Sequence, residues 1–234
     1  MINSARRFAA QEIAHRWFAY FEGVTEPLTD HLDLFTEDVR LIHARRTLLA
    51  DGKAQLAAWL KQVPAETSSH LIHEFALQSL DNSSALLTMQ VAYQALAHDQ
   101  LIGAIIDYQA KVVFASDDSA QFALIQKSPI AANPALCFKL SFAEHRQLAL
   151  LSQLGYQGQR GGIEWTQFCQ EDAIVEQLKR RFNPLAAQDA AELTAQMLAD
   201  HKMRIQLGDS SQTKCDLQLK DAGGRYLSIV AILD

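Results

Sequence analysis

Residues 35–43 read FTEDVRLIH and end on His43, and Gly52 follows nine positions later. Val39, Leu41 and His43 occupy alternate positions, so they would share one face of a β-strand. The stretch therefore predicts the first strand of a short hairpin. Gly52 follows an aspartate, which predicts a turn that leads into a helix.

Three helices and four longer strands are predicted around this hairpin. Apolar spacing predicts helices over residues 5–22, 27–35 and 53–63. Between residues 70 and 127, apolar side chains alternate with a period of two in four segments joined by short polar connectors, which predicts an antiparallel meander. Helices followed by antiparallel strands, without parallel β-α-β units, make the fold class α+β.

The chain has 234 residues, which is enough for two domains of modest size. A stretch of small residues around Asn133 and Pro134 is the predicted boundary. It separates a domain over residues 1–132 from a smaller α+β domain over residues 133–234, for which no motif indicates a role. The patterns in this second domain predict helices over 141–155, 167–182 and 184–200, and strands over 136–140, 203–207, 214–219 and 225–233.

Composition and charge exclude several classes of protein. Hydrophobic residues make up 49% of the chain, which excludes a disordered polymer. The formal net charge is −6, so we expect no nucleic-acid partner, and the longest apolar runs are too short to span a membrane. The three cysteines lie far apart, so we expect no metal, no cofactor and no disulfide framework. These features predict a cytoplasmic protein.

The FTEDVRLIH stretch, Gly52 and the order of elements resemble the NTF2-like superfamily, in particular its SnoaL-like and ketosteroid-isomerase-like branches, over about residues 5–130. The resemblance implies a cone in which three helices pack on a curved antiparallel sheet around an internal cavity. It also implies a homodimer formed through the sheet. Members of the family include isomerases, cyclases, dehydratases and non-catalytic binders, so the fold does not decide the activity.

Three positions of the resemblance bear on catalysis. Where ketosteroid isomerase carries its carboxylate base, this chain carries His43, whose neutral imidazole can accept a proton near pH 7. The family tyrosine that stabilises an enolate corresponds to Trp17, with Tyr20 three residues further along the same helix face. The third family position is a carboxylic acid on a late strand. Asp107 is the candidate for it, but strand alternation places its side chain on the face away from the apolar residues. The candidate catalytic residues are therefore His43 and Tyr20, and steroid isomerisation is not supported.

A wider set of polar and aromatic side chains is expected to line the cavity. The ligand-binding candidates are Trp17, Tyr20, His43, Trp59, His73, Tyr93 and Tyr108. Each could instead be a packed core residue, and a shift of one residue in strand register would turn His73 outward. His70 and His73 do not form a metal-binding pair, because this spacing places two strand side chains on opposite faces.

Three hypotheses about function follow from these features. In the first, the cone binds a small apolar or aromatic molecule without catalysis. In the second, the protein is a SnoaL-like cyclase, isomerase or dehydratase that uses His43 as its acid–base group. In the third, the domain is a non-catalytic dimerisation or interaction module.

Overall fold

The computed structural model describes residues 2–23, 26–63, 67–97, 100–133, 142–182, 193–199, 201–207 and 214–233. These residues divide into two compact units. The first unit combines Met1–Ile2 with Arg16–Phe142, and the second combines Asn3–His15 with Ala143–Asp234. The long first helix, α1 (Ser4–Gly23), therefore contributes to both units.

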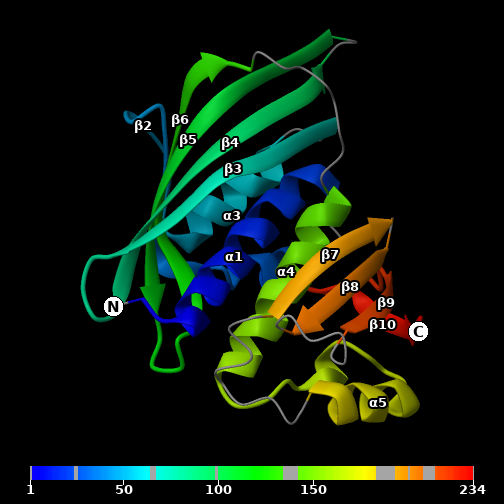
Figure 1. Ribbon diagram of the computed structural model, residues 1–234. Helices are drawn as coiled ribbons and strands as arrows, with labels where there is room; N and C mark the ends of the chain where they lie inside the picture. Colours follow the sequence, from blue (N-terminus) through cyan, green and yellow to red (C-terminus); the bar gives the residue numbers. More distant parts are fainter. Residues whose placement is uncertain are drawn as a thin grey trace. The chain divides into compact units, whose positions relative to one another are not determined.

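The first unit is built on a curved six-stranded sheet with the order β2-β1-β6-β5-β4-β3. Figure 1 shows α3 and the second half of α1 on one side of this sheet. All neighbouring strands are antiparallel except β1 and β6, which run parallel. The strands are β1 (Phe35–His43), β2 (Thr47–Asp51), β3 (Thr67–Ser79), β4 (Ser84–Ala97), β5 (Gln100–Phe114) and β6 (Ala120–Ala132), and the short helices are α2 (Leu28–Leu32) and α3 (Lys53–Gln62).

Gly52 connects β2 to α3 in a backbone conformation that favours glycine. Its φ angle is +89°, and its N–H donates a 2.7 Å hydrogen bond to the carbonyl of Val39. A side chain at this φ would be strained. The turn predicted from the FTEDVRLIH stretch is thus present, and the α+β fold class, with helices packed on a curved sheet, is confirmed. The second helix is shorter than predicted, because β1 already begins at Phe35.

The second unit pairs helices with a four-stranded sheet of order β10-β9-β8-β7. Its core contains Trp165, Phe168 and Leu178 from the helical part, and Ile205 and Leu217 from the sheet. Alternate residues of β9 are buried, as a strand with one covered face requires. Its elements are α4 (Phe142–Gln159), η1 (Trp165–Gln167), α5 (Asp172–Phe182), β7 (Leu193–Ala199), β8 (Lys202–Leu207), β9 (Lys214–Lys220) and β10 (Ser228–Ile232).

The predicted helix over residues 184–200 is wrong where the structure describes it. Residues 193–199 form β7, which pairs with β8 from Leu193 opposite Leu207 to Ala199 opposite Lys202. Residues such as Ala, Leu, Gln and Met favour a helix locally, but pairing with a neighbouring strand overrides this weak preference. The strand predicted over residues 136–140 lies outside the described residues.

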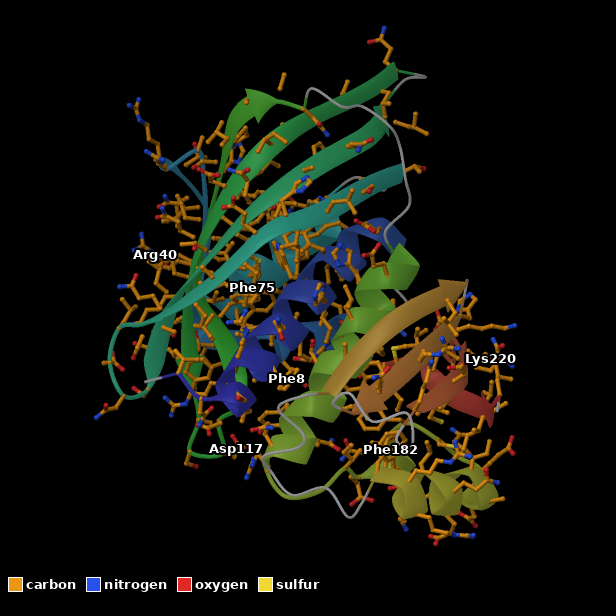
Figure 2. The ribbon with its side chains drawn as sticks, in the orientation of Figure 1. Phe8, Arg40, Phe75, Asp117, Phe182 and Lys220 are labelled. Atoms are coloured by element: carbon orange, nitrogen blue, oxygen red, sulfur yellow. The ribbon has the colours of Figure 1, made fainter. Side chains whose placement is uncertain are left out.

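The first half of α1 packs within the second unit. Phe8 lies near the start of α1 (Figure 2), and a Cβ atom added to Gly155 of α4 would lie 2.6 Å from its ring. Glu12 accepts a 2.7 Å hydrogen bond from the hydroxyl of Tyr226. The predicted division at residue 133 assigned this whole helix to the first domain, whereas contacts divide the helix after His15. Gly155 was also expected to end its helix, but it is an interior position against which Phe8 packs.

Candidate functional site

The first unit contains a pocket of about 290 Å³ between its sheet and its helices. Strands β3 to β6 and β1 supply most of the wall, and α1 and α3 supply the rest. Aromatic and apolar side chains predominate. The lining residues are Phe21, His43, Trp59, Val63, His70, Tyr93, Ala104, Ile106, Tyr108, Lys127 and Pro129.

Four of the predicted ligand-binding residues line this pocket, namely His43, Trp59, Tyr93 and Tyr108. Strand register explains how three of them converge, because Tyr93 pairs with Ala104 and Tyr108 pairs with Lys127, which in turn pairs with His43. Residues directly opposite each other on neighbouring strands point to the same face of the sheet. The alternation read from the sequence thus located these side chains.

Trp17 and Tyr20 were expected in the cavity, but neither is among its lining residues. The Trp17 ring packs edge-on against Phe21 and Phe35, and the Tyr20 ring stacks on His31 with 4.2 Å between ring centroids. Both side chains are therefore directed toward α2 and the start of β1. Phe21, one residue after Tyr20 on the helix, lines the pocket instead. Burial raises the pKa of Tyr20, so this phenol stays protonated at neutral pH.

His73 was also expected in the cavity, but its side chain is exposed. The pairing of β3 with β4 is continuous from Thr67 to Ile72 and resumes at Glu74, so a bulge places one extra residue at position 73. Because a bulge adds one residue to a strand, the side chains that would share a face across it point to opposite faces of the sheet. Before the bulge, His70 is therefore the residue of β3 that faces the pocket, opposite Tyr93 of β4.

His70 is held in the pocket wall by a buried carboxylate. The Glu22 side chain is 0% exposed, and its Oε1 accepts a hydrogen bond from the His70 backbone N–H and lies 3.2 Å from His70 Nδ1. The imidazole is enclosed by Phe18 and Tyr93, whose ring centroids lie 5.2 and 5.1 Å away. A carboxylate at Nδ1 favours the tautomer whose Nε2 carries the lone pair. Sequence reasoning missed this pair, because Glu22 and His70 are 48 residues apart.

His43 and Lys127 form the polar end of the pocket. The two residues are partners in the β1–β6 pairing, and Lys127 Nζ lies 5.3 Å from the centroid of the Trp59 ring. Burial and, secondarily, the charge of Lys127 lower the pKa of His43. The His43 Nδ1 atom is buried and has no hydrogen-bond partner in the part of the chain that the structure describes. His43 is therefore neutral at pH 7 and can donate or accept one further hydrogen bond.

Tyr108 closes the inner side of the pocket. Its ring packs edge-on against Phe18 at 5.2 Å between centroids. Burial raises the pKa of Tyr108, although the nearby Trp17 indole acts in the opposite direction. The hydroxyl is therefore a neutral donor rather than a phenolate.

A second buried polar cluster lies in the same unit and serves the fold. Arg16 donates 2.9 Å hydrogen bonds to Glu26 and to the carbonyl of Asp30, and His31 Nδ1 lies 3.0 Å from the other oxygen of Glu26. These contacts tie α1 to the segment that carries α2. None of the four residues lines the pocket described above.

Neither a metal centre nor a membrane-spanning helix is found among the described residues. Within the described ranges, no group of three or more His, Cys, Asp or Glu side chains could hold a metal ion. No helix of that part of the chain is long and apolar enough to cross a bilayer.

No protein-family model and no curated protein matches the sequence. Solved structures do match the fold. A protein provisionally described as an aromatic-ring hydroxylase from Novosphingobium aromaticivorans is 15% identical, with 57% of this chain and 96% of that chain covered and a TM-score of 0.49. A ketosteroid isomerase-like protein from Erwinia carotovora atroseptica is 16% identical, with 56% of this chain and 99% of that chain covered and a TM-score of 0.44. An NTF2-like protein with a cystatin-like fold from N. aromaticivorans is 10% identical, with 57% of this chain and 84% of that chain covered and a TM-score of 0.40.

In the first unit, helices pack on a curved antiparallel sheet, and a partly open pocket lies between them. The α+β fold class agrees with the order of elements that the sequence predicted. At these levels of identity the likeness is one of fold alone, so any function must be argued from this chain's own pocket.

Proposed function

We propose that the pocket of the first unit binds a small planar aromatic molecule. The observation that carries the proposal is the composition of the wall, in which Phe21, Trp59 and Tyr93 surround an open space together with Ala104 and Ile106. Ligand sites are mostly apolar and aromatic, with a few placed polar groups that orient the ligand. His43, His70 and the two tyrosine hydroxyls are suited to that orienting role.

The size of the pocket limits the ligand. Its volume of about 290 Å³ is at the lower end for small-molecule sites, which begin at roughly 300 Å³. A molecule of one or two fused rings suits this space better than a steroid.

Asp107, the candidate for the carboxylic acid of the family, does not line this pocket. It lies on the opposite face of the sheet, where it accepts a 3.3 Å hydrogen bond from Gln90. Dimerisation through the sheet and a cytoplasmic location remain predictions.

Filling the pocket should abolish binding of a neutral aromatic probe. Ala104→Leu adds volume inside the pocket, so the affinity for 2-naphthalenemethanol should fall at least about tenfold. Gln109→Leu on the exposed side of the same strand is the control and should leave the affinity unchanged. Titration calorimetry measures both constants. Equal affinities for wild type and Ala104→Leu would place the probe elsewhere and refute the proposal.

Proton-transfer catalysis is the second candidate function, and the Glu22–His70 pair favours it. A carboxylate that orients an imidazole at a pocket wall is a common arrangement for acid–base chemistry. His43, neutral and on the same pocket, would serve as the base. Such a site suits the isomerase, cyclase or dehydratase hypothesis, whereas a plain binder needs no oriented imidazole.

Deuterium exchange at the α-carbon of 2-tetralone, followed by NMR, tests the catalytic candidate. Catalysed exchange should be seen with wild-type protein and should fall about 10²–10⁴-fold in His43→Gln, while the ketone still binds. His73→Gln is the matched control, because its side chain is exposed. Exchange that is no faster than in buffer would leave ligand binding as the function of this pocket.

A further inference from the structure

The second half of strand β3 is an open edge of the first unit's sheet. β3 is the last strand of the six, so among the described residues it has a neighbouring strand on one side only, namely β4 (Figure 1). Residues 68–70 near its start are all buried, whereas none of residues 74–79 is buried. Such an edge presents a row of backbone N–H and C=O groups with which a further strand can pair.

Residues 74–79 lack the features by which edge strands usually avoid pairing. Protected edges are short, or they carry lysine, proline or a bulge. The opposite edge, β2, has only five residues and follows the exposed Arg45 and Arg46. Residues 74–79 read EFALQS, without lysine, arginine or proline, and the bulge at position 73 lies before them rather than within them.

Alternate residues of this segment divide into an apolar and a polar face. Phe75 and Leu77 are half-buried, and they pair with Met89 and Leu87 of β4, which are buried in the core. The exposed positions on the other face are Glu74, Ala76 and Gln78. A strand added at this edge would therefore cover more of both apolar side chains.

The segment is complementary to an antiparallel copy of itself when the pairing is centred on Ala76. Phe75 then lies opposite Leu77 of the copy, and Glu74 lies opposite Gln78, whose amide can donate to the carboxylate. Centring on Leu77 would instead place Phe75 opposite a serine, and centring on Phe75 would bring the bulge at position 73 into the pairing. The register about Ala76 is thus the one that matches like with like and opposes no two equal charges.

We propose that residues 74–79 form a self-association edge, at which two copies of this chain pair antiparallel about Ala76. The two sheets then continue into each other across a two-fold axis, and such a contact closes as a dimer. Two strands of six residues are too short to bury the roughly 1,200 Å² of a stable interface, so the dissociation constant should lie between about 1 µM and 1 mM. None of these residues lines the pocket described above, so association does not depend on ligand binding there.

Disulfide trapping tests this pairing. Ala76→Cys would place two thiols opposite each other, with about 4.5–5.5 Å between Cα atoms, which a disulfide accepts. With oxidised glutathione, this variant should form a covalent dimer at least about tenfold faster than Gln78→Cys, which is also exposed but lies opposite position 74 of the copy. Wild-type protein, with its three native cysteines, gives the background on a non-reducing gel. Equal rates for the two variants would overturn the proposal.

Mixed variants distinguish pairing of edges from packing of faces. Glu74→Cys and Gln78→Cys should form a dimer when mixed, and so should Phe75→Cys and Leu77→Cys, because edge pairing brings both faces of the strand into register. Gln109→Cys, at an exposed position of β5, should stay monomeric. A dimer of Gln109→Cys, or one from the 74/78 mixture but not from a folded 75/77 mixture, would show that faces meet and would overturn the proposal. If substitution at 75 or 77 unfolds the chain, the exposed positions 74, 76, 78 and 109 still decide.

Discussion

Replacing Glu26 by alanine should lower the free energy of unfolding by about 3–5 kcal/mol, the range for breaking one partner of a buried ion pair. Arg16 and Glu26 are only 5% and 6% exposed, and 2.9 Å separates their charged atoms. The variant would leave the Arg16 guanidinium buried without this carboxylate, and His31 would lose the oxygen 3.0 Å from its Nδ1. Both losses weaken the connection between α1 and α2.

Glu26 is ionised in this cluster, which is why its loss should be costly. Burial alone would raise its pKa, but the hydrogen bond from His31 and the charge of Arg16 outweigh burial and lower the pKa of the carboxyl. Burial lowers the pKa of His31, so the imidazole is neutral and Arg16 supplies the balancing charge. Glu26→Gln keeps the shape of the side chain but removes its charge, so it should destabilise less than the alanine variant.

An exposed ion pair of the same unit provides the control. Arg40 and Asp51 are 53% and 59% exposed, with Nε and Oδ1 3.7 Å apart. Asp51→Ala should cost about 0–1 kcal/mol, as solvent-exposed pairs do. Urea unfolding followed by circular dichroism measures both variants. Losses of equal size at positions 26 and 51 would contradict the role given to the buried cluster.

Acidification should destabilise the second unit through a pair of histidines, the half-buried His15 and the buried His145. The Nδ1 atoms of His15 and His145 lie 3.0 Å apart, so one ring must donate the hydrogen bond and the other must accept it. Burial, reinforced by repulsion from His145, lowers the pKa of His15 well below its usual value. A second proton at this contact would place two N–H groups face to face.

The direction of the effect follows from proton uptake. The unfolded chain binds a proton at His15 near pH 6.5, whereas the folded chain resists it, so stability is lost as pH falls below 6.5. The slope from this one group should approach about 1.4 kcal/mol per pH unit until the folded-state pKa is reached. His31 and His43 also have lowered pKa values, so they add to the slope of the wild-type protein.

The variant His15→Asn isolates the contribution of the pair. An asparagine places a polar atom close to the position of Nδ1, so it can keep the hydrogen bond to His145 without titrating. Urea unfolding between pH 5 and 7.5 should show a smaller slope for this variant than for wild type. His201→Asn, at an exposed position with a φ of +59° that asparagine tolerates, should leave the slope unchanged. Identical slopes for all three proteins would disprove the assignment.

Local alternation predicted the parts of the site that regular strands carry. His43, Tyr93 and Tyr108 lie where period two places them, because their strands pair without a register shift at those residues. The prediction failed at His73, because the bulge beside it is not visible in the spacing of apolar residues. The sequence placed His70 and His73 on opposite faces and assigned His73 to the cavity, whereas the pairing with β4 shows that His70 faces the pocket.

Helix faces were predicted less well than strand faces. α1 is apolar over much of its surface, so the side chain that faces the sheet could not be separated from its neighbours. Phe21 took the place expected for Tyr20, and Glu22 at the last turn of the helix supplied a partner for His70 that no local pattern indicates. Contacts between residues far apart in sequence depend on tertiary packing, which spacing alone does not encode.

The division of α1 between the two compact units has a practical consequence for gene fragments. Phe8, Glu12 and His15 lie in α1, yet their neighbours Gly155, Tyr226 and His145 are encoded more than 100 codons later. A fragment that encodes residues 133–234 alone would lack the part of α1, residues 3–15, that packs within this unit. Any shuffling of this C-terminal unit onto another protein would have to bring those early codons with it.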